Sequence, residues 1–341
     1  MNLTDFDYFL PEEMIAQEPV SRRDSSKLMV LHLDNAPLEH RRFTDLVDYL
    51  RPGDTLVINE TKVIPARLFG IKDTTGARVE VLILKQLEKN RWEALVRPGK
   101  RLSAGTKIIF GDGLLEALVL DHTDFGGRVL EFSYNGLFEE ILDRVGTMPI
   151  PPYIKKPLSD KQRYQTIYAR QAGSAAAPTA GLHFSRELLE RILNMGVIIV
   201  PVLLHVGLGT FRPVQVNDIR EHHMHAEYYE ISEEAASAIN ETKRRKGRLV
   251  AVGTTTTRCL ESAAGENGKI CPGSGWTDIF IYPGYRFKLV ESLVTNFHLP
   301  KSTLLMMVSA LAGKDKIMAA YNEAVRLKYR FFSFGDAMLI I

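Results

Sequence analysis

The stretch 175–214 most constrains what this chain can fold into, because two similar polar loops flank one predicted helix and one predicted strand. The first loop, AAAPTAGLHF, places Thr179, Gly181 and His183 within five positions. The second loop, HVGLGTFRPV, contains His205, Gly207, Gly209, Thr210 and Arg212. Glycine lets the backbone approach a ligand closely. One such loop is equally typical of a tight turn around a buried histidine, but two of them favour two walls of one pocket.

The segment between the loops predicts a buried parallel strand. Ser185 is a typical N-cap for a helix over 186–194, and Gly196 is a typical end. The run 197–205 is then almost continuously apolar, as in strands that are covered on both faces. Parallel strands need crossover connections, so this pattern predicts an α/β domain with a mixed or parallel sheet flanked by helices.

Polar residues follow other predicted strands of this domain in the same way. The cluster Asn59–Lys62 follows a strand over 54–58, and Gly253 with Thr254, Thr255, Thr256 and Thr257 follows a strand over 249–252. Open α/β sheets bind ligands at the carboxyl ends of their strands. A Gly-Thr turn before a helix, here predicted from Arg258, favours an anion site, although a well-capped helix is the alternative.

The segment 68–150 has a different pattern, with short β-rich runs separated by polar or glycine-containing turns. Strands are predicted over 78–84, 92–96, 107–110, 114–120 and 128–132. This spacing predicts a small closed β-barrel inserted into the α/β domain. The predicted main domain is therefore discontinuous, 1–67 and 151–341, with the barrel domain at 68–150.

The C-terminal third predicts further elements of the main domain. Strands are expected over 277–282 and 289–295, the latter leading into Asn296 and His298. Pro300 is expected to open a helix that ends at Ala312, because proline is frequent in the first helical turn.

Composition and charge restrict the class of protein. The chain has 341 residues, and 43 Lys and Arg balance 41 Asp and Glu to a net charge of +2, so nucleic-acid binding would need a local basic patch. Only Cys259 and Cys271 are present, which excludes a disulfide framework or a cysteine-based zinc site and fits a reducing compartment. With neither a signal core nor a long apolar run, we expect a cytoplasmic protein without a membrane span.

Two further clusters of residues have side chains that could bind ligands. Lys155, Lys156 and Arg163 alternate with tyrosines in and after a proline-rich linker, a pattern that can hold phosphates and stack bases but is also typical of a solvated linker. The histidines in EHHMHAE match no zinc spacing, so we expect no bound metal.

The motifs taken together resemble a known family. The chain is similar to the S-adenosylmethionine:tRNA ribosyltransferase-isomerases of queuosine synthesis over almost its whole length. The matching stretches include DFDYFLPEEMIAQEP, RRDSSKLMVL, NETKVIPARLFG, AAPTAGLHF, HVGLGTFRPV, GTTTTRCLES, TNFHLPKSTLLMMVSALAG and YRFFSFGDAMLI. Departures are slight, at Ser185, Glu291 and Leu311, and remove no polar group from an expected site.

The resemblance implies a monomeric, cytoplasmic enzyme with an α/β domain and an inserted β-barrel. It implies a tRNA substrate with 7-aminomethyl-7-deazaguanine at the wobble position. The ribosyl group of S-adenosylmethionine would be transferred and rearranged to give epoxyqueuosine, with release of adenine and methionine. S-adenosylmethionine would be a consumed cosubstrate, so no resident cofactor is expected.

The residues suit this chemistry. A sulfonium cation acidifies the adjacent ribose carbon, so a general base is needed, and departing adenine needs a proton donor. His183, His205 and His298 are the candidates, and His183 ranks first because of the neighbouring glycine. For substrate binding we expect the following residues: Arg67, Thr179, Gly181, Gly207, Gly209, Thr210, Arg212, Thr254, Thr255, Thr256, Arg258 and Asn296.

Two other functions are alternatives to this one. A base-exchanging transglycosylase would use a carboxylate nucleophile, here Asp336 or Glu261. A non-catalytic RNA-binding module is disfavoured by the near-neutral charge and by the polar Gly-Thr-His loops.

Overall fold

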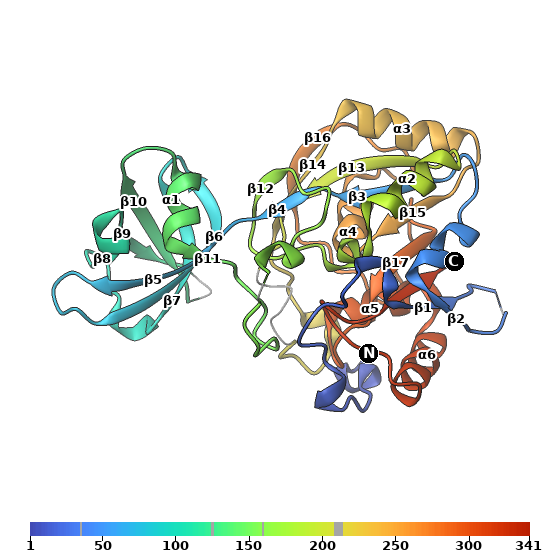
Figure 1. Cartoon of the computed structure of the whole chain (residues 1–341), viewed down its shortest axis with the longest axis horizontal. Helices are drawn as coiled ribbons and strands as arrows, with labels where there is room; N and C mark the ends of the chain where they lie inside the picture. Colours follow the sequence, from blue (N-terminus) through green and yellow to red (C-terminus); the bar gives the residue numbers. More distant parts are fainter. Residues whose placement is uncertain (35, 124–125, 159, 208–213) are drawn as a thin grey trace. The chain divides into compact units, whose positions relative to one another are not determined.

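The computed structural model describes residues 1–34, 36–123, 126–158, 160–207 and 214–341. These residues divide into two compact units (Figure 1). The main unit comprises Met1–Thr61, Pro152–Gln171 and Pro178–Ile341, as far as they are described. The barrel unit comprises Lys62–Pro151 and Ala172–Ala177. The predicted domain boundaries at 67/68 and 150/151 stay a prediction.

A nine-stranded mixed sheet forms the centre of the main unit, in the order β16-β14-β13-β3-β15-β17-β18-β1-β2. Four neighbouring strands, β13, β3, β15 and β17, are parallel. β18 runs antiparallel to β17, and β1 runs parallel to β18. The strands are β1 Lys27–Leu31, β2 Glu39–Arg42, β3 Thr55–Asn59, β13 Ile198–Leu204, β14 Glu227–Ile231, β15 Leu249–Val252, β16 Gly273–Thr277, β17 Ser292–Asn296 and β18 Ala337–Ile340.

Helices cover both faces of this sheet. The main-unit α-helices are α2 Arg186–Asn194, α3 Glu233–Arg244, α4 Thr254–Ala263, α5 Thr303–Ala312 and α6 Lys314–Arg326. The 3-10 helices are η1 Leu3–Phe6, η2 Glu12–Met14, η3 Arg23–Ser25, η4 Phe43–Tyr49, η7 Lys161–Tyr164, η8 Thr179–His183 and η10 Ile219–Glu221.

Alternation along the strands separates the two faces. Leu56 and Ile58 of β3 pack in one core cluster with Leu188 of α2. Thr55 points to the other face, where its hydroxyl lies 2.6 Å from that of Thr242 in α3. Successive strand residues face opposite sides of a sheet, so α2 and α3 lie on opposite faces. The predicted α/β class with a mixed sheet is confirmed.

The barrel unit contains a closed antiparallel barrel. Six strands follow the order β5-β6-β7-β10-β9-β8, and pairing of β5 with β8 closes the ring. These strands are β5 Arg67–Lys72, β6 Arg78–Glu88, β7 Arg91–Arg97, β8 Lys107–Phe110, β9 Leu115–His122 and β10 Arg128–Tyr134. The η5 turn Gly99–Arg101, the η6 turn Gly111–Gly113, α1 Phe138–Val145 and β11 Gly146–Thr147 complete this part of the chain. The predicted barrel is confirmed, and alternate strand residues such as Val81 and Ile83 fill its core.

Two short strands lie where the chain passes between the units. β4 Thr61–Val63 pairs with β12 Gln171–Ser174 in a two-stranded sheet.

Three of the differences between predicted and observed elements have a visible local cause. Helix α4 begins at Thr254 rather than Arg258, because the Thr256 and Thr257 hydroxyls donate to carbonyls four residues earlier and so fit a helix. The predicted strand 277–282 was wrong: β16 ends at Thr277, whose hydroxyl accepts the Ile279 amide at 3.2 Å and turns the chain. Helix α5 begins at Thr303, because Ser302 rather than Pro300 supplies the cap.

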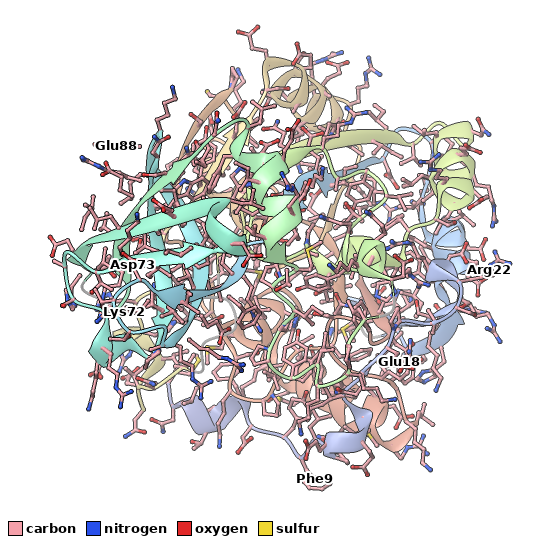
Figure 2. All side chains as sticks on the ribbon, turned by 60° about the vertical axis from the view of Figure 1, so that its left-hand side comes forward. Phe9, Glu18, Arg22, Lys72, Asp73 and Glu88 are labelled. Atoms are coloured by element: carbon pink, nitrogen blue, oxygen red, sulfur yellow. The ribbon has the colours of Figure 1, made fainter. Side chains whose placement is uncertain are left out.

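The surface contains exposed charged side chains and scattered apolar ones. Glu18 and Arg22 lie at the surface of the main unit, as does Phe9, which is 79% exposed (Figure 2). Over the described residues, the helices include none with the length and apolar character that a membrane crossing requires.

Candidate functional site

Several of the predicted site residues that the structure describes in the main unit lie at one edge of the sheet. The four parallel strands end there, β3 at Asn59 and β17 at Asn296. β18 and β1 begin at the same edge, since Ala337 pairs with Asn296 and Leu28 pairs with Ala337. Parallel strands place their carboxyl ends together, so segments far apart in the sequence meet at this edge.

A hydrogen-bond network joins the first polar loop to β17 and β1. The hydroxyl of Thr179 donates to Oδ1 of Asn296 at 2.8 Å. The Asn296 amide lies 3.0 Å from Nε2 of His183, and Nδ1 of His183 lies 2.8 Å from the hydroxyl of Ser26. The structure therefore brings three predicted site residues into one chain of contacts and adds Ser26.

The network fixes the protonation state of His183. An amide nitrogen only donates, so Nε2 of His183 accepts from Asn296 and the ring proton resides on Nδ1. Burial, followed by the charges of Arg330 and Arg23, lowers the pKa of His183 to about 3. The imidazole stacks on Phe43 with ring centroids 5.0 Å apart and is neutral at physiological pH.

Gly181 allows the first loop to lie against the segment around Tyr168. A Cβ atom at Gly181 would lie 2.0 Å from the Tyr168 hydroxyl oxygen and 2.8 Å from Cγ2 of Thr166. Any larger residue would displace one of the two segments. The glycine thus serves close packing within the protein, which its sequence position alone does not distinguish from close approach to a ligand.

Asn59 joins the ends of β3 and β13 to helix α4. Its Oδ1 accepts the amides of Thr61 and Leu204, both at 3.1 Å. Its amide donates to the Leu204 carbonyl at 2.9 Å and to the Thr255 hydroxyl at 3.3 Å. Asn59 is completely buried, so these bonds hold the strand ends in register.

His205 stands directly after β13 and is half-buried. Its Nδ1 lies 2.8 Å from the Thr61 hydroxyl, and its ring stacks on Tyr228 at 5.9 Å. Nε2 has no hydrogen-bond partner among the described residues. Burial lowers the pKa of His205, against a smaller opposite effect of Glu230. Burial therefore favours the neutral form of His205, and its Nε2 is available as far as the described residues are concerned.

His298 lies on the other face of the sheet from His183. Its Nε2 contacts the Thr295 hydroxyl at 2.8 Å, whereas His183 contacts Asn296. Thr295 and Asn296 are successive strand residues and point to opposite faces. Burial lowers the pKa of His298 to about 3. The three predicted histidines thus do not converge on one point.

The threonines at the start of α4 differ in what their hydroxyls contact. Gly253 occupies the N-cap position with φ +91° and has no side chain to accept from the first-turn amides. Thr256 is completely buried and donates its hydroxyl proton to the Val252 carbonyl at 2.7 Å, so that proton is not available to an anion. The hydroxyl of Thr254 has no hydrogen-bond partner among the described residues. The first-turn amides and Thr254 are the groups available here for an anion.

Arg258 forms a buried ion pair with Glu227. Both side chains are at most 4% exposed, and Arg258 also donates to the Thr277 and Ile279 carbonyls, each at 3.3 Å. The other Glu227 oxygen accepts the Gly207 amide at 2.7 Å. Arg258 is thus committed to fixing the start of the second polar loop, rather than exposed to a substrate.

Gly209, Thr210 and Arg212 lie outside the described residues. Arg67 belongs to the barrel unit, where its Nε lies 3.5 Å from Glu80.

The residues predicted to contact tRNA make contacts with the N-terminal arm. Lys155 pairs with Glu12, and Lys156 lies 3.2 Å from Glu18. Arg163 donates to the Val20 and Ser21 carbonyls at 2.6 and 3.0 Å, respectively. The two lysines stay exposed, whereas Arg163 holds the arm in place.

The histidine cluster shows no arrangement typical of a metal site. Within the described ranges, no group of three or more His, Cys, Asp or Glu side chains is placed to hold an ion. The His222 ring instead lies edge-on to Phe280, 5.3 Å away.

Sequence reasoning missed Ser26 and Glu227. Ser26 lies in the matched RRDSSKLMVL stretch immediately before β1, so its position at a strand start was a usable signal. Glu227 is a buried acid, and no local pattern distinguishes it from an exposed one.

Comparison with known proteins places the chain in a family. A family model described as queuosine biosynthesis protein matches residues 3–340. A Pelotomaculum thermopropionicum protein named S-adenosylmethionine:tRNA ribosyltransferase-isomerase is 72% identical over 341 residues, covering 100% of both chains. Proteins of the same name from Desulforamulus reducens and Symbiobacterium thermophilum are 63% and 62% identical, again over 100% of both chains. The crystal structure of S-adenosylmethionine tRNA ribosyltransferase from Thermotoga maritima is similar, with 42% identity, a TM-score of 0.56, and coverage of 99% of this chain and 100% of that one. The chain therefore belongs to the queuosine biosynthesis protein family.

Proposed function

We propose that this protein is an S-adenosylmethionine:tRNA ribosyltransferase-isomerase. It transfers the ribosyl group of S-adenosylmethionine to 7-aminomethyl-7-deazaguanine at the wobble position of tRNA and isomerises it. The product is epoxyqueuosine in tRNA, and adenine and methionine are released. The observation that carries this proposal is the 72% identity over the full length of a relative with that name.

The chemistry explains why the site needs neutral imidazoles. The sulfonium of S-adenosylmethionine stabilises a carbanion on the adjacent ribose carbon, so a neutral base can remove a proton there. Departing adenine then takes up a proton. Because the sulfonium supplies the activation, we propose that the reaction needs no metal and that S-adenosylmethionine is consumed rather than retained as a cofactor. The protein acts as a monomer in the cytoplasm, where tRNA is found.

We propose His205 as the base, although the sequence ranked His183 first. Proton transfer to Nε2 of His183 would require loss of its hydrogen bond from Asn296. Among the described residues His205 needs no such rearrangement, because Thr61 contacts its Nδ1 and none of them contacts its Nε2. His183 then positions Asn296 and, through it, Thr179. The amides of the first turn of α4 bind the methionine carboxylate.

The two carboxylates that a transglycosylase could use as its nucleophile already accept hydrogen bonds from the protein. Glu261 accepts four hydrogen bonds, from the amides of Lys288, Leu289 and Val290 and from the Tyr285 hydroxyl. Asp336 accepts the backbone amides of Lys27 and Arg330. Neither carboxylate is available as a nucleophile, which favours the ribosyl transfer.

Two labels in S-adenosylmethionine test the proposal. We expect label from the ribose to appear in tRNA, with adenine and methionine in solution, and a chelator to leave the rate unchanged. Label from the methyl group in tRNA would instead identify a methyltransferase. Base exchange without any need for S-adenosylmethionine would identify a transglycosylase.

A further inference from the structure

A pocket of about 760 Å³ opens in the main unit beside the His183 network, and basic side chains dominate its lining. Ser26, which contacts His183, forms part of its wall. The charged lining residues are two aspartates and the basic residues Lys27, Arg41, Arg42, Lys328 and Arg330. The whole chain has a net charge of only +2, so this pocket is a local concentration of positive charge.

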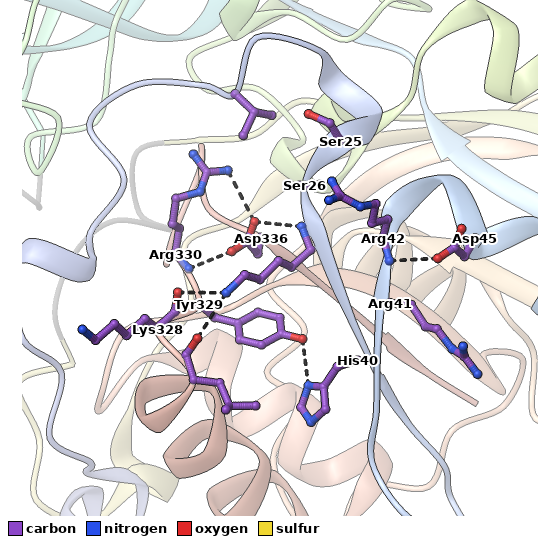
Figure 3. Close-up of a pocket in the computed structure, with 13 residues that line it drawn as sticks. Ser25, Ser26, His40, Arg41, Arg42, Asp45, Lys328, Tyr329, Arg330 and Asp336 are labelled. Atoms are coloured by element: carbon purple, nitrogen blue, oxygen red, sulfur yellow. Dashed lines mark hydrogen bonds and ion pairs between the residues drawn. The ribbon is translucent and has the colours of Figure 1, made fainter.

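Two of these cations are exposed and have no carboxylate partner among the described residues, namely Arg42 and Lys328. Figure 3 shows the Arg42 side chain pointing toward Ser26, whereas Arg41 points away from the pocket. Arg41 is bound to Glu39 at 2.6 Å and to the Tyr49 hydroxyl at 3.1 Å. Arg42 and Lys328 are therefore available for an anionic ligand.

The other charged side chains of the pocket contact groups of the protein, and these contacts do not make the pocket negative. The Lys27 ammonium donates to the carbonyls of Leu327 and Lys328 at 3.1 and 3.2 Å, and carbonyls leave its charge uncancelled. Asp336 is buried, accepts the amides of Lys27 and Arg330, and pairs with the Arg330 guanidinium at 3.4 Å, so the charges of Arg330 and Asp336 offset each other. The other aspartate, Asp45, accepts the backbone amide of Arg42 at 3.0 Å. Lys27, Arg42 and Lys328 have no carboxylate partner among the described residues, so the lining keeps a net positive charge.

We infer that this pocket binds backbone phosphates of the tRNA substrate, an inference that rests on the proposed function. Guanidinium and ammonium groups are the usual partners of phosphates. A pocket with several cations suits a polyanion such as RNA better than it suits a ligand with a single carboxylate. A phosphate held beside Ser26 brings the RNA backbone next to the His183 network. The pocket thereby positions the nucleotide to be modified.

Other basic segments are better neutralised. Lys155 and Lys156 pair with Glu12 and Glu18. In the run 243–248, Lys243 pairs with Glu291, Arg244 and Arg245 pair with Glu241, and Arg248 pairs with Asp54. These pairs reduce the attraction that those segments exert on a phosphate backbone.

The test compares two double substitutions that remove the same charge. Arg42→Gln with Lys328→Gln changes the pocket, and Arg51→Gln with Lys246→Gln is the control. Arg42 and Arg51 each donate their amide to the aspartate three residues on, at 3.0 and 2.9 Å. Lys328 and Lys246 each follow a helix with positive φ, 52° and 58°. The control residues precede β3 and β15 and so lie at the opposite edge of the sheet.

The measurement is the dissociation constant for tRNA carrying the target base, as a function of salt. We expect the pocket variant to bind more weakly at low salt and its log–log salt slope to fall by about 1.5 units, because each lost phosphate contact removes about 0.7–0.9. The affinity for S-adenosylmethionine should not change. A slope equal to that of the control variant, or a loss of S-adenosylmethionine affinity alone, would overturn the inference.

A second measurement uses the unmodified protein and does not depend on the folding of a variant. We expect tRNA to protect Lys328, but not Lys246, from acylation as read by mass spectrometry, and equal protection would overturn the inference. Both measurements report binding without chemistry. A protein that binds tRNA in this way yet transfers no ribose would therefore contradict only the proposed function.

Discussion

The side-chain amide of Asn296 donates a hydrogen bond to Nε2 of His183 across 3.0 Å. Asn296 ends a central strand and His183 ends a 3-10 helix, so the contact joins two segments that are 113 residues apart. Because Nδ1 of His183 contacts Ser26, both ring nitrogens are engaged. His183 therefore acts through its neighbours unless a substrate displaces Asn296.

Alanine substitutions separate the roles of His205 and His183. We expect His205→Ala to slow the chemical step of ribosyl transfer by roughly 10²-fold or more, because the general base is lost, while tRNA affinity is retained. The pH–rate profile should also lose its acidic limb, which lies below the ordinary histidine pKa because burial lowers the pKa of His205. Single-turnover rates from pH 5 to 8 check this. If His183→Ala instead loses the rate and the acidic limb while His205→Ala stays active, His183 is the general base.

The buried histidines predict that acid destabilises the main unit. The folded-state pKa of His298 is about 3, below its unfolded value, so the unfolded chain binds a proton that the folded chain excludes. The stability that neutral His298 contributes is thus present above about pH 6.5 and is lost as the pH falls toward 3. We expect the difference in unfolding free energy between the wild type and His298→Gln to shrink by about 2 kcal/mol from pH 7.5 to 5.0. Urea titrations at both pH values measure it, and a constant difference would contradict the prediction.

The Arg258–Glu227 pair predicts strong coupling. Removing either partner leaves the other as a buried unpaired charge. Arg258→Met should therefore lower the unfolding free energy by about 3–5 kcal/mol, and Glu227→Gln should lower it by less, because glutamine can still form hydrogen bonds. The double substitution should cost clearly less than the sum of the two. Urea unfolding of the three variants tests this coupling. Additive effects would mean that the pair contributes nothing as a unit.

The close contact between Gly181 and Tyr168 predicts that a substitution of Tyr168 compensates for one of Gly181. Gly181→Ala should destabilise the protein by about 1–3 kcal/mol, because the new methyl group overlaps the Tyr168 hydroxyl. Tyr168→Phe alone should be nearly neutral, since this buried hydroxyl has no hydrogen-bond partner in the described structure. Combined with Gly181→Ala, it should restore part of the loss in a thermal unfolding experiment. A double variant as unstable as Gly181→Ala would show that the hydroxyl is not the obstacle.

Local patterns in the sequence determined the fold class and many element bounds. The predicted helix 186–194 is α2, the strand 107–110 is β8, and the strand 249–252 is β15. Periodicity, caps and turn residues act over a few positions, so they can be read from neighbouring residues. The short-strand pattern of the barrel was readable for the same reason.

Only the tertiary structure decided what each candidate side chain contacts. Ser26 meets His183 across 157 positions of sequence, and Arg258 is occupied by Glu227, 31 positions away. These contacts follow from the order β13-β3-β15-β17-β18-β1, which brings strand ends together without any local signal. Sequence could place the three histidines in polar loops. The alternation of faces along β17 decided that His298 lies on the opposite face of the sheet from His183.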